Sequence, residues 1–396
     1  MRFRIWTTLC ILFSLILTVI SVDVVDDLRL VHIVFRHGDR APLNVYKSDP
    51  YGVKIWKGGL GKLTNKGTKQ LYEMGKFFKP RYSRFLDAEN ARSQIYIRSS
   101  DADRTLHSAG AFAAGMFPPT ADEKWDNQLG QIWRPVSIHT VPEKEENLLS
   151  QKTDCPAYKR FKKEQMSHPE TKRLYDHYRP LFDWITQNSG EASNIKTMAD
   201  AYDIMNRVRD VTFCQVSNGY AMPAWMNDTM LRQMTRIHEL DFHVKAGANA
   251  DYPRARLAGG RMLQVILEHL AITMDNVTEP EDDIKLYIYS AHDNAVAALL
   301  STLGVYDYNV TEGDFVGLGQ PKYGAAVIVE LFNNHTVRVS YKNDPDNIPT
   351  AEPTVLINPH CPAYCPLDKF KILAKPYLVD DWDQECEIIV ETSWRR

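Results

Sequence analysis

Two arginines and a histidine follow an apolar run near the N-terminus. Residues 28–35 have the composition of a buried β-strand, and Arg36, His37 and Arg40 lie in the segment directly after it. Guanidinium groups suit tetrahedral oxyanions such as phosphate, and a histidine between two of them can attack phosphorus. Gly38 adds no side chain that would block a ligand. The segment predicts a phosphate site with a nucleophilic histidine, although alone it could be a basic loop.

A further cation follows a second predicted strand. Residues 95–98 are β-branched and aromatic, and Arg104 lies near the start of a helix predicted over residues 102–116, which Ser100 or Asp101 could cap. A cation in the first helical turn opposes the helix dipole, so this arginine is more easily understood if it holds an anion. A solvated surface arginine is the alternative.

A third strand end carries a histidine and a carboxylate. The strand expected within residues 284–291 leads into His292 and Asp293, at the start of a helix over residues 294–303. In open α/β sheets, ligands bind at the carboxyl ends of the strands. An ordinary helix cap would account for Asp293 but not for the histidine before it. We therefore expect the three strand ends to form one site.

These loops are accompanied by further short segments at residues 63–67, 98–105, 139–142 and 361–367. In this order, the set resembles the histidine acid phosphatase family, the branch 2 histidine phosphatases, and within it the animal prostatic and lysosomal group. The resemblance runs over nearly the whole mature chain. It implies an acid phosphatase that hydrolyses phosphate monoesters through a phosphohistidine intermediate at acidic pH.

The resemblance also implies a role for each of six side chains. His37 would be the nucleophile, and Asp293 would donate a proton to the leaving alcohol. Crowded positive charge would lower the pKa of His37 and keep its imidazole neutral in acid. The same charge would do the work of a metal ion, so neither a metal nor a cofactor is expected. Phosphate would be bound by Arg36, Arg40, Arg104 and His292.

The resemblance implies an α/β fold, with a mixed, phosphoglycerate-mutase-like β-sheet flanked by helices and a smaller all-α insertion domain. We predict a signal peptide at 1–22, a catalytic domain formed by 23–150 plus 256–396, and a helical insertion, or cap, at 151–255. The cap is rich in Lys, Glu, Met and Tyr and has few β-branched runs. A hairpin over residues 325–341 should lie at the edge of the sheet.

The N-terminus suggests the compartment. A basic start and an apolar run within residues 1–22 are typical of a secretory signal, with a retained anchor as the alternative. No later stretch is apolar enough to span a bilayer. We expect a protein that is secreted or lies in the lumen of the secretory or lysosomal pathway. The net charge of −3 suggests no nucleic-acid partner.

Cysteines and glycosylation sequons agree with that compartment. Cys361 and Cys365 are close enough for a local bridge, and Cys155 and Cys386 match a pair of the resembled family. Cys214 would be left as a buried free thiol or an intermolecular link, and its partly apolar neighbours favour burial. Acceptor sequons begin at Asn227, Asn276, Asn309 and Asn334.

Two other functions stay open. One is a phytase-like inositol-phosphate phosphatase, which a lysine-rich pocket would indicate, and the other is a non-catalytic secreted binding protein on the same scaffold. All six core residues are present, which disfavours the second. Lysines that could favour the first are Lys47, Lys54, Lys57 and Lys62.

Two further segments bear on subunit contact and on metal binding. Residues 133–139 resemble a family region of subunit contact, so a homodimer is expected, unless Trp133 and Ile138 simply fill the core. The histidines of residues 238–243 are spaced five apart, one residue too long for a metal pair on a helix. We expect that segment to be a surface helix.

Overall fold

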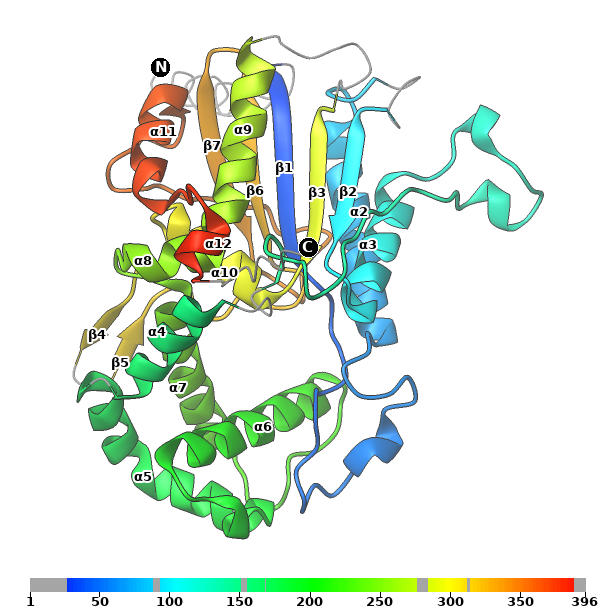
Figure 1. Cartoon of the computed structure of the whole chain (residues 1–396). Helices are drawn as coiled ribbons and strands as arrows, with labels where there is room; N and C mark the ends of the chain where they lie inside the picture. Colours follow the sequence, from blue (N-terminus) through cyan, green and yellow to red (C-terminus); the bar gives the residue numbers. More distant parts are fainter. Residues whose placement is uncertain are drawn as a thin grey trace, which may run out of the picture.

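One mixed β-sheet forms the centre of the protein (Figure 1). The computed structural model describes residues 27–87, 93–150, 155–167, 169–275, 284–311 and 314–387, so the expected signal peptide lies outside the described residues. β2, β3 and β1 are parallel neighbours, and β6 and β7 continue the sheet antiparallel, with β8 and β9 both paired to β7. The strands span Leu28–Arg36 (β1), Ile95–Ser99 (β2), Leu286–Ala291 (β3), Asn309–Thr311 (β4), Asp314–Val316 (β5), Ala326–Phe332 (β6), Thr336–Lys342 (β7), Thr354–Val355 (β8) and Cys365–Pro366 (β9).

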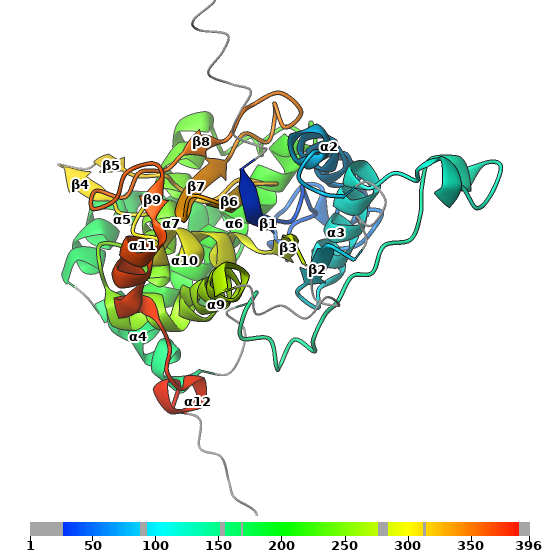
Figure 2. The same ribbon diagram turned by 90° about the horizontal axis from the view of Figure 1, so that it is seen from above.

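Helices cover both faces of this sheet (Figure 2). Strand β1 is buried on both sides, because Leu30 and Val34 belong to one apolar core while Val31 and Ile33 belong to the other. α9, α10 and α11 supply the first core, and α2 and α3 supply the second. The predicted mixed sheet flanked by helices is confirmed. These helices span Asn65–Tyr82 (α2), Asp103–Met116 (α3), Arg261–Asp275 (α9), Asp293–Thr302 (α10) and Leu367–Ala374 (α11).

Two local predictions were wrong. Ala102 precedes α3 and gives no side-chain cap, because the Ser100 hydroxyl is bonded to Thr105 and His292 instead. The β6–β7 hairpin does not lie at the sheet edge, because β8 and β9 pair with the far side of β7. Strands of two residues are too short to show a periodicity in the sequence.

A second group of helices lies beyond the carboxyl ends of the parallel strands (Figure 1). α5, α6 and α7 share a separate apolar core that includes Phe182, Ile204 and Met234, which gives the expected smaller all-α unit. The residue limits expected for this cap stay a prediction. α7 is not the expected surface helix, because His243 is fully buried and stacks on Tyr306. The helices here and at the C-terminal end span Pro156–Ser167 (α4), Pro169–Ser189 (α5), Met198–Ser217 (α6), Asp228–Ala246 (α7), Tyr252–Ala255 (α8) and Trp382–Glu385 (α12).

Two disulfides join cysteines of the described residues. Cys155, before α4, is bonded to Cys386, after α12, and Cys361 is bonded to Cys365. Cys214 is a free, buried thiol, as expected, and is not available for an intermolecular link.

Within the described ranges, no helix is both long and apolar enough to cross a membrane. Asn276 lies outside the described residues, and the exposed sequon residues are Asn227, Asn309 and Asn334.

Glycines let α2 and α3 approach to backbone contact. A methyl group at Gly75 would lie 2.1 Å from the carbonyl oxygen of Phe112, and one at Gly115 would lie 2.1 Å from that of Tyr72. Real carbon atoms do not approach so closely, so any larger residue would force the helices apart. The Arg104 segment depends on this packing, because α3 follows β2 directly.

We expect Gly75→Ala to lower the free energy of unfolding by about 2 kcal/mol or more, because backbone atoms must move to admit the methyl group. Urea unfolding followed by circular dichroism measures it. Gly110→Ala in α3 is the matched control, since nothing lies within 4 Å of its added methyl group. That variant should be neutral or about 0.5–1 kcal/mol more stable, because alanine favours helix. Equal stability of the two variants would contradict the close packing.

Candidate active site

The three predicted segments meet because their strands are parallel and end level. Arg36 of β1 lies beside Ala291 of β3, and Ser99 of β2 lies beside Ser290. The His37 backbone N–H donates to the Ala291 carbonyl at 3.0 Å, which extends the pairing one residue into the loop. Arg104 and Asp293 then occupy the first turns of α3 and α10, whose N-terminal dipoles favour an anion.

His37 is fixed in one tautomer. Its Nδ1 lies 2.8 Å from the Gly38 carbonyl oxygen, which can only accept, so Nδ1 carries the hydrogen and Nε2 keeps its lone pair. The ring is 2% exposed. Burial, and then the positive charge of Arg36, hold the pKa of His37 well below its usual value, with smaller contributions from His292 and Arg104. The imidazole is therefore a neutral base with a free nitrogen, even in acid.

Gly38 has a different purpose from the one expected. A methyl group there would lie 2.4 Å from the carbonyl oxygen of Gly67, and one at Gly67 would lie 2.1 Å from that of Asp39. The glycine therefore makes room for the start of α2 and not for a ligand. This close contact fixes the height of the loop above the sheet.

Asp39 joins the loop to both parts of the protein. Its fully buried carboxylate accepts hydrogen bonds from Thr64 at 2.6 Å, at the start of α2. It also accepts from Ser217 at 2.7 Å and Asn218 at 3.0 Å, at the end of α6. Both carboxylate oxygens are thus bound by side chains from the two parts of the fold, so Asp39 acts as a structural carboxylate.

Arg36 is bound to the carboxylate on α10. Its guanidinium lies 2.9 Å from Asp293 Oδ2, donates to the Pro321 carbonyl at 2.6 Å, and stacks 4.2 Å from the centre of the Tyr323 ring. Burial alone would raise the pKa of Asp293, but Arg36 and then Arg40 lower it further than burial raises it. Without an anion in the site, Asp293 is therefore ionised and paired.

Arg40 is held by a residue that the sequence did not indicate. Asp210 of α6 accepts two hydrogen bonds from it, at 2.9 and 3.2 Å. The Arg40 guanidinium also donates to the Ala41 carbonyl and lies 3.6 Å from the Cys214 sulfur. Burial raises the pKa of Cys214 to about 12, so this thiol stays protonated. No local pattern marks Asp210, because it is one acidic residue within a long charged helix.

Arg104 and His292 form the other side of the site. The Arg104 guanidinium donates to His292 Nδ1 at 3.2 Å, and His292 Nε2 donates to the Ser100 hydroxyl at 2.9 Å. Nδ1 is thus an acceptor here, and it can offer an N–H to an anion only once it is protonated. The His37 and His292 rings lie 5.7 Å apart, centre to centre. The structure thus brings all six predicted side chains together, because Arg36, Arg40, Arg104 and His292 all act on His37 and Asp293 is paired with Arg36.

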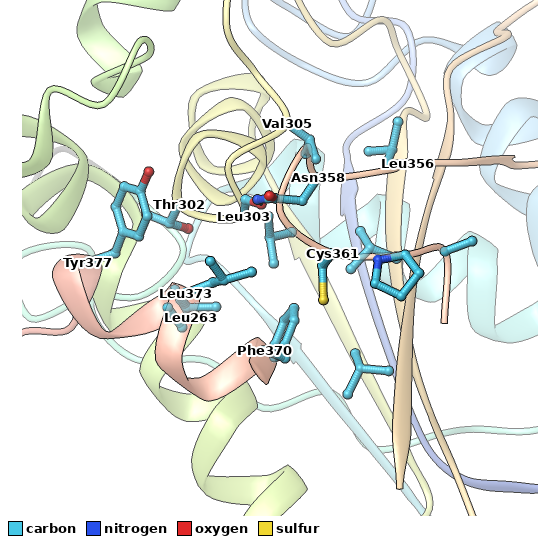
Figure 3. A pocket seen from close by; sticks show the side chains of 15 residues that line it. Leu263, Thr302, Leu303, Val305, Leu356, Asn358, Cys361, Phe370, Leu373 and Tyr377 are labelled. Atoms are coloured by element: carbon cyan, nitrogen blue, oxygen red, sulfur yellow. The ribbon is translucent and has the colours of Figure 1, made fainter. Parts of the chain in front are cut away.

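Neither metal clusters nor a distant pocket compete with this site. In the described part of the chain, no group of three or more His, Cys, Asp and Glu residues is placed to hold a metal ion. A pocket lies between α10, α11 and β7, lined by Leu303, Val305, Phe370 and Leu373 (Figure 3). It is apolar and lies at the opposite end of α10 from Asp293, about 15 Å along the helix. None of the residues that line it is an arginine, lysine or histidine that could bind phosphate.

Comparisons with known proteins show what this chain is similar to. The sequence model of the histidine phosphatase superfamily (branch 2) matches residues 27–342. Prostatic acid phosphatase of Rattus norvegicus is 33% identical over 364 residues, covering 91% of this chain and 89% of that protein. Lysosomal acid phosphatase of Homo sapiens is 32% identical over 367 residues, covering 91% and 80%. Hafnia alvei phytase in complex with tartrate shares the fold, with a TM-score of 0.64, 18% identity, and coverage of 91% and 98%.

We expect the pKa of His37 to lie well below 6.5 in the free protein and to rise when inorganic phosphate binds, because the anion offsets the surrounding positive charge. Nitrogen NMR of histidine-labelled protein measures this, with the resonance assigned by its loss in His37→Asn. His32, buried in β1 and stacked on Tyr287, also has a lowered pKa and serves as the control that phosphate should leave unchanged. A His37 that titrates at its ordinary value would contradict the argument.

Proposed function

This chain belongs to branch 2 of the histidine phosphatase superfamily, and we propose that it is an acid phosphatase that hydrolyses phosphate monoesters through a phosphohistidine. The observation that carries the proposal is the neutral Nε2 atom of His37 among buried guanidinium groups. A phosphate monoester would place its phosphorus against that nitrogen, with its oxygens bound by Arg36, Arg40 and Arg104.

In the first step, the Nε2 lone pair of His37 forms the bond to phosphorus while the ester P–O bond breaks. The charge on the equatorial oxygens is stabilised by guanidinium groups that are already in place, so little reorganisation is needed. His292 would add an N–H once its Nδ1 is protonated, because that nitrogen otherwise accepts from Arg104. Six side chains thus carry out the phosphoryl transfer, and no step requires a metal.

Asp293 would deliver a proton to the leaving oxygen. Its pKa is lowered in the free site, largely because Arg36 offsets the effect of burial. When the substrate's negative charge binds to Arg36, that lowering is reduced and the buried carboxyl takes up a proton more readily. Acidic pH favours this state. In the second step, Asp293 accepts a proton from water, the water oxygen bonds to phosphorus, and the P–N bond breaks to release phosphate.

Support for the phytase-like alternative is weaker. Lys62 is bound to Asp103 at the start of α3, so its charge is already engaged. The similar phytase structures are under 25% identical and bear on the fold alone. The relatives include prostatic and lysosomal acid phosphatases. Their names support the proposal that this protein belongs to the secretory or lysosomal pathway. For the same compartment, we propose that the signal peptide is cleaved and that the exposed sequons are glycosylated.

The direct test is to trap the phosphoenzyme. Wild-type protein mixed with phosphorus-32-labelled phenyl phosphate and quenched in alkali should carry an acid-labile label. His37→Ala should carry none and should turn over at least about a thousandfold more slowly, because the nucleophile is lost. His360→Ala is the control, since His360 is exposed and should be unimportant. A label that persists in His37→Ala would disprove the assigned nucleophile.

We also propose that the protein is a homodimer. The segment between α3 and the cap projects from the molecule (Figure 2) and exposes 56% of Trp125, 49% of Leu129 and 71% of Ile132. In the expected contact region, residues 133–139, Ile138 packs on the sheet core while Trp133 is 36% exposed, so the contact proposed here extends from Trp133 back to Trp125. Exposed apolar side chains clustered on one projection are typical of a protein interface.

Sedimentation of the deglycosylated protein should give a dimer, with or without reductant, because Cys214 is buried. Ile132→Glu should give a folded monomer, since it places a charge in the apolar contact. Ile372→Glu is a matched control, because that side chain is 70% exposed on α11, away from the projection. A wild-type monomer, or dissociation of both variants, would contradict the proposed interface.

A further inference from the structure

One buried arginine beside the site has no ion pair. Arg209 of α6 is 5% exposed, and no carboxylate in the described part of the chain lies within 4 Å of it. Its neighbour Asp210 is bound by Arg40 instead. One nitrogen of Arg209 donates to the Gln320 side-chain oxygen at 2.7 Å, and its Nε has no hydrogen-bond partner. Asp210 and Glu239 offset only part of the cost of burying this cation, so it still favours an anion from outside the chain.

Gln320 places this cation relative to the reaction. Its side-chain nitrogen donates to Asp293 Oδ2 at 2.8 Å, so one amide group separates the proton donor from Arg209. The two hydrogen bonds and the amide together span at most about 8 Å. Because Asp293 protonates the leaving oxygen, the alcohol part of a substrate must extend from that oxygen past Asp293. Arg209 therefore lies on the side of the leaving alcohol.

Aromatic side chains connect the buried Arg209 with the protein surface. Its guanidinium lies 5.6 Å from the centre of the Phe213 ring, which is itself 37% exposed. The Phe213 ring lies 5.9 Å from that of Tyr323, which in turn lies 5.9 Å from His37. Aromatic side chains thus lead from the nucleophile to the partly exposed Phe213 ring, and Arg209 lies beside that ring.

We infer that Arg209, held by Gln320, binds a second anionic group on the alcohol part of the substrate. This inference rests on the proposed phosphatase activity and adds a substrate class, namely phosphomonoesters with a carboxylate or further phosphate about three carbons from the ester oxygen. Arg36, Arg40 and Arg104 bind the phosphoryl group that is transferred, and Arg209 binds the anionic group on the leaving alcohol.

Two substrates that differ in one group provide the test. Glycerate 3-phosphate has a carboxylate where glycerol 1-phosphate has a neutral hydroxymethyl group, and that carboxylate is ionised at about pH 5. We expect wild-type protein to prefer the first by about tenfold or more in kcat/KM, chiefly through KM. In Arg209→Gln the preference should fall to about one, while kcat/KM for glycerol 1-phosphate changes less than about threefold.

Arg207→Gln is the matched control, because it removes a charge from the same helix but from a residue paired with Glu191 at 3.3 Å. It should keep the wild-type preference. Equal use of the two substrates by the wild-type protein would overturn the inference whether or not the variants fold. Equal losses for both substrates in Arg209→Gln would also overturn it, since Arg209 would then only align Gln320. Hydrolysis of neither substrate, nor of phenyl phosphate, by the wild-type protein would instead refute the proposed activity.

Discussion

The structure depends on keeping one imidazole uncharged among several guanidinium groups. Like charges at such short range repel, and burial removes the water that would screen them. The protein offsets part of the charge with two carboxylates, as Arg36 is paired with Asp293 and Arg40 with Asp210. Arg104 has a histidine nitrogen as its partner, which leaves its charge for an anion. The nucleophile thus stays neutral while the site as a whole remains attractive to phosphate.

This balance explains why the site needs both parts of the fold. The level ends of β1, β2 and β3 bring the attacking and binding side chains to one edge, which the sheet alone provides. The carboxylate that holds Arg40 comes from α6, in the helical cap. A sheet without the cap would carry the same motifs with one of its arginines unaligned.

Much of the site could be predicted from the sequence, because each motif follows a strand of recognisable composition within a few residues. The reason for Gly38 could not, since the nearby Gly67 backbone is a tertiary contact with no local signal. Asp210 and Gln320 were missed for a related reason. Asp210 is an ordinary polar residue of a cap helix, and Gln320 lies in the loop before β6, so each meets the site only through tertiary contacts. The hairpin was placed at the edge because β8 and β9 are too short to detect.

The buried Asp39 carboxylate has a consequence for how the cap can be exchanged. It accepts hydrogen bonds from Thr64 of the sheet part and from Ser217 and Asn218 at the end of α6, while α6 also supplies Asp210. The cap has its own apolar core, yet it is not an interchangeable module. Any cap grafted onto this sheet would have to reproduce one helix face residue by residue, so evolution can vary the outer helices α4 and α5 far more freely than α6.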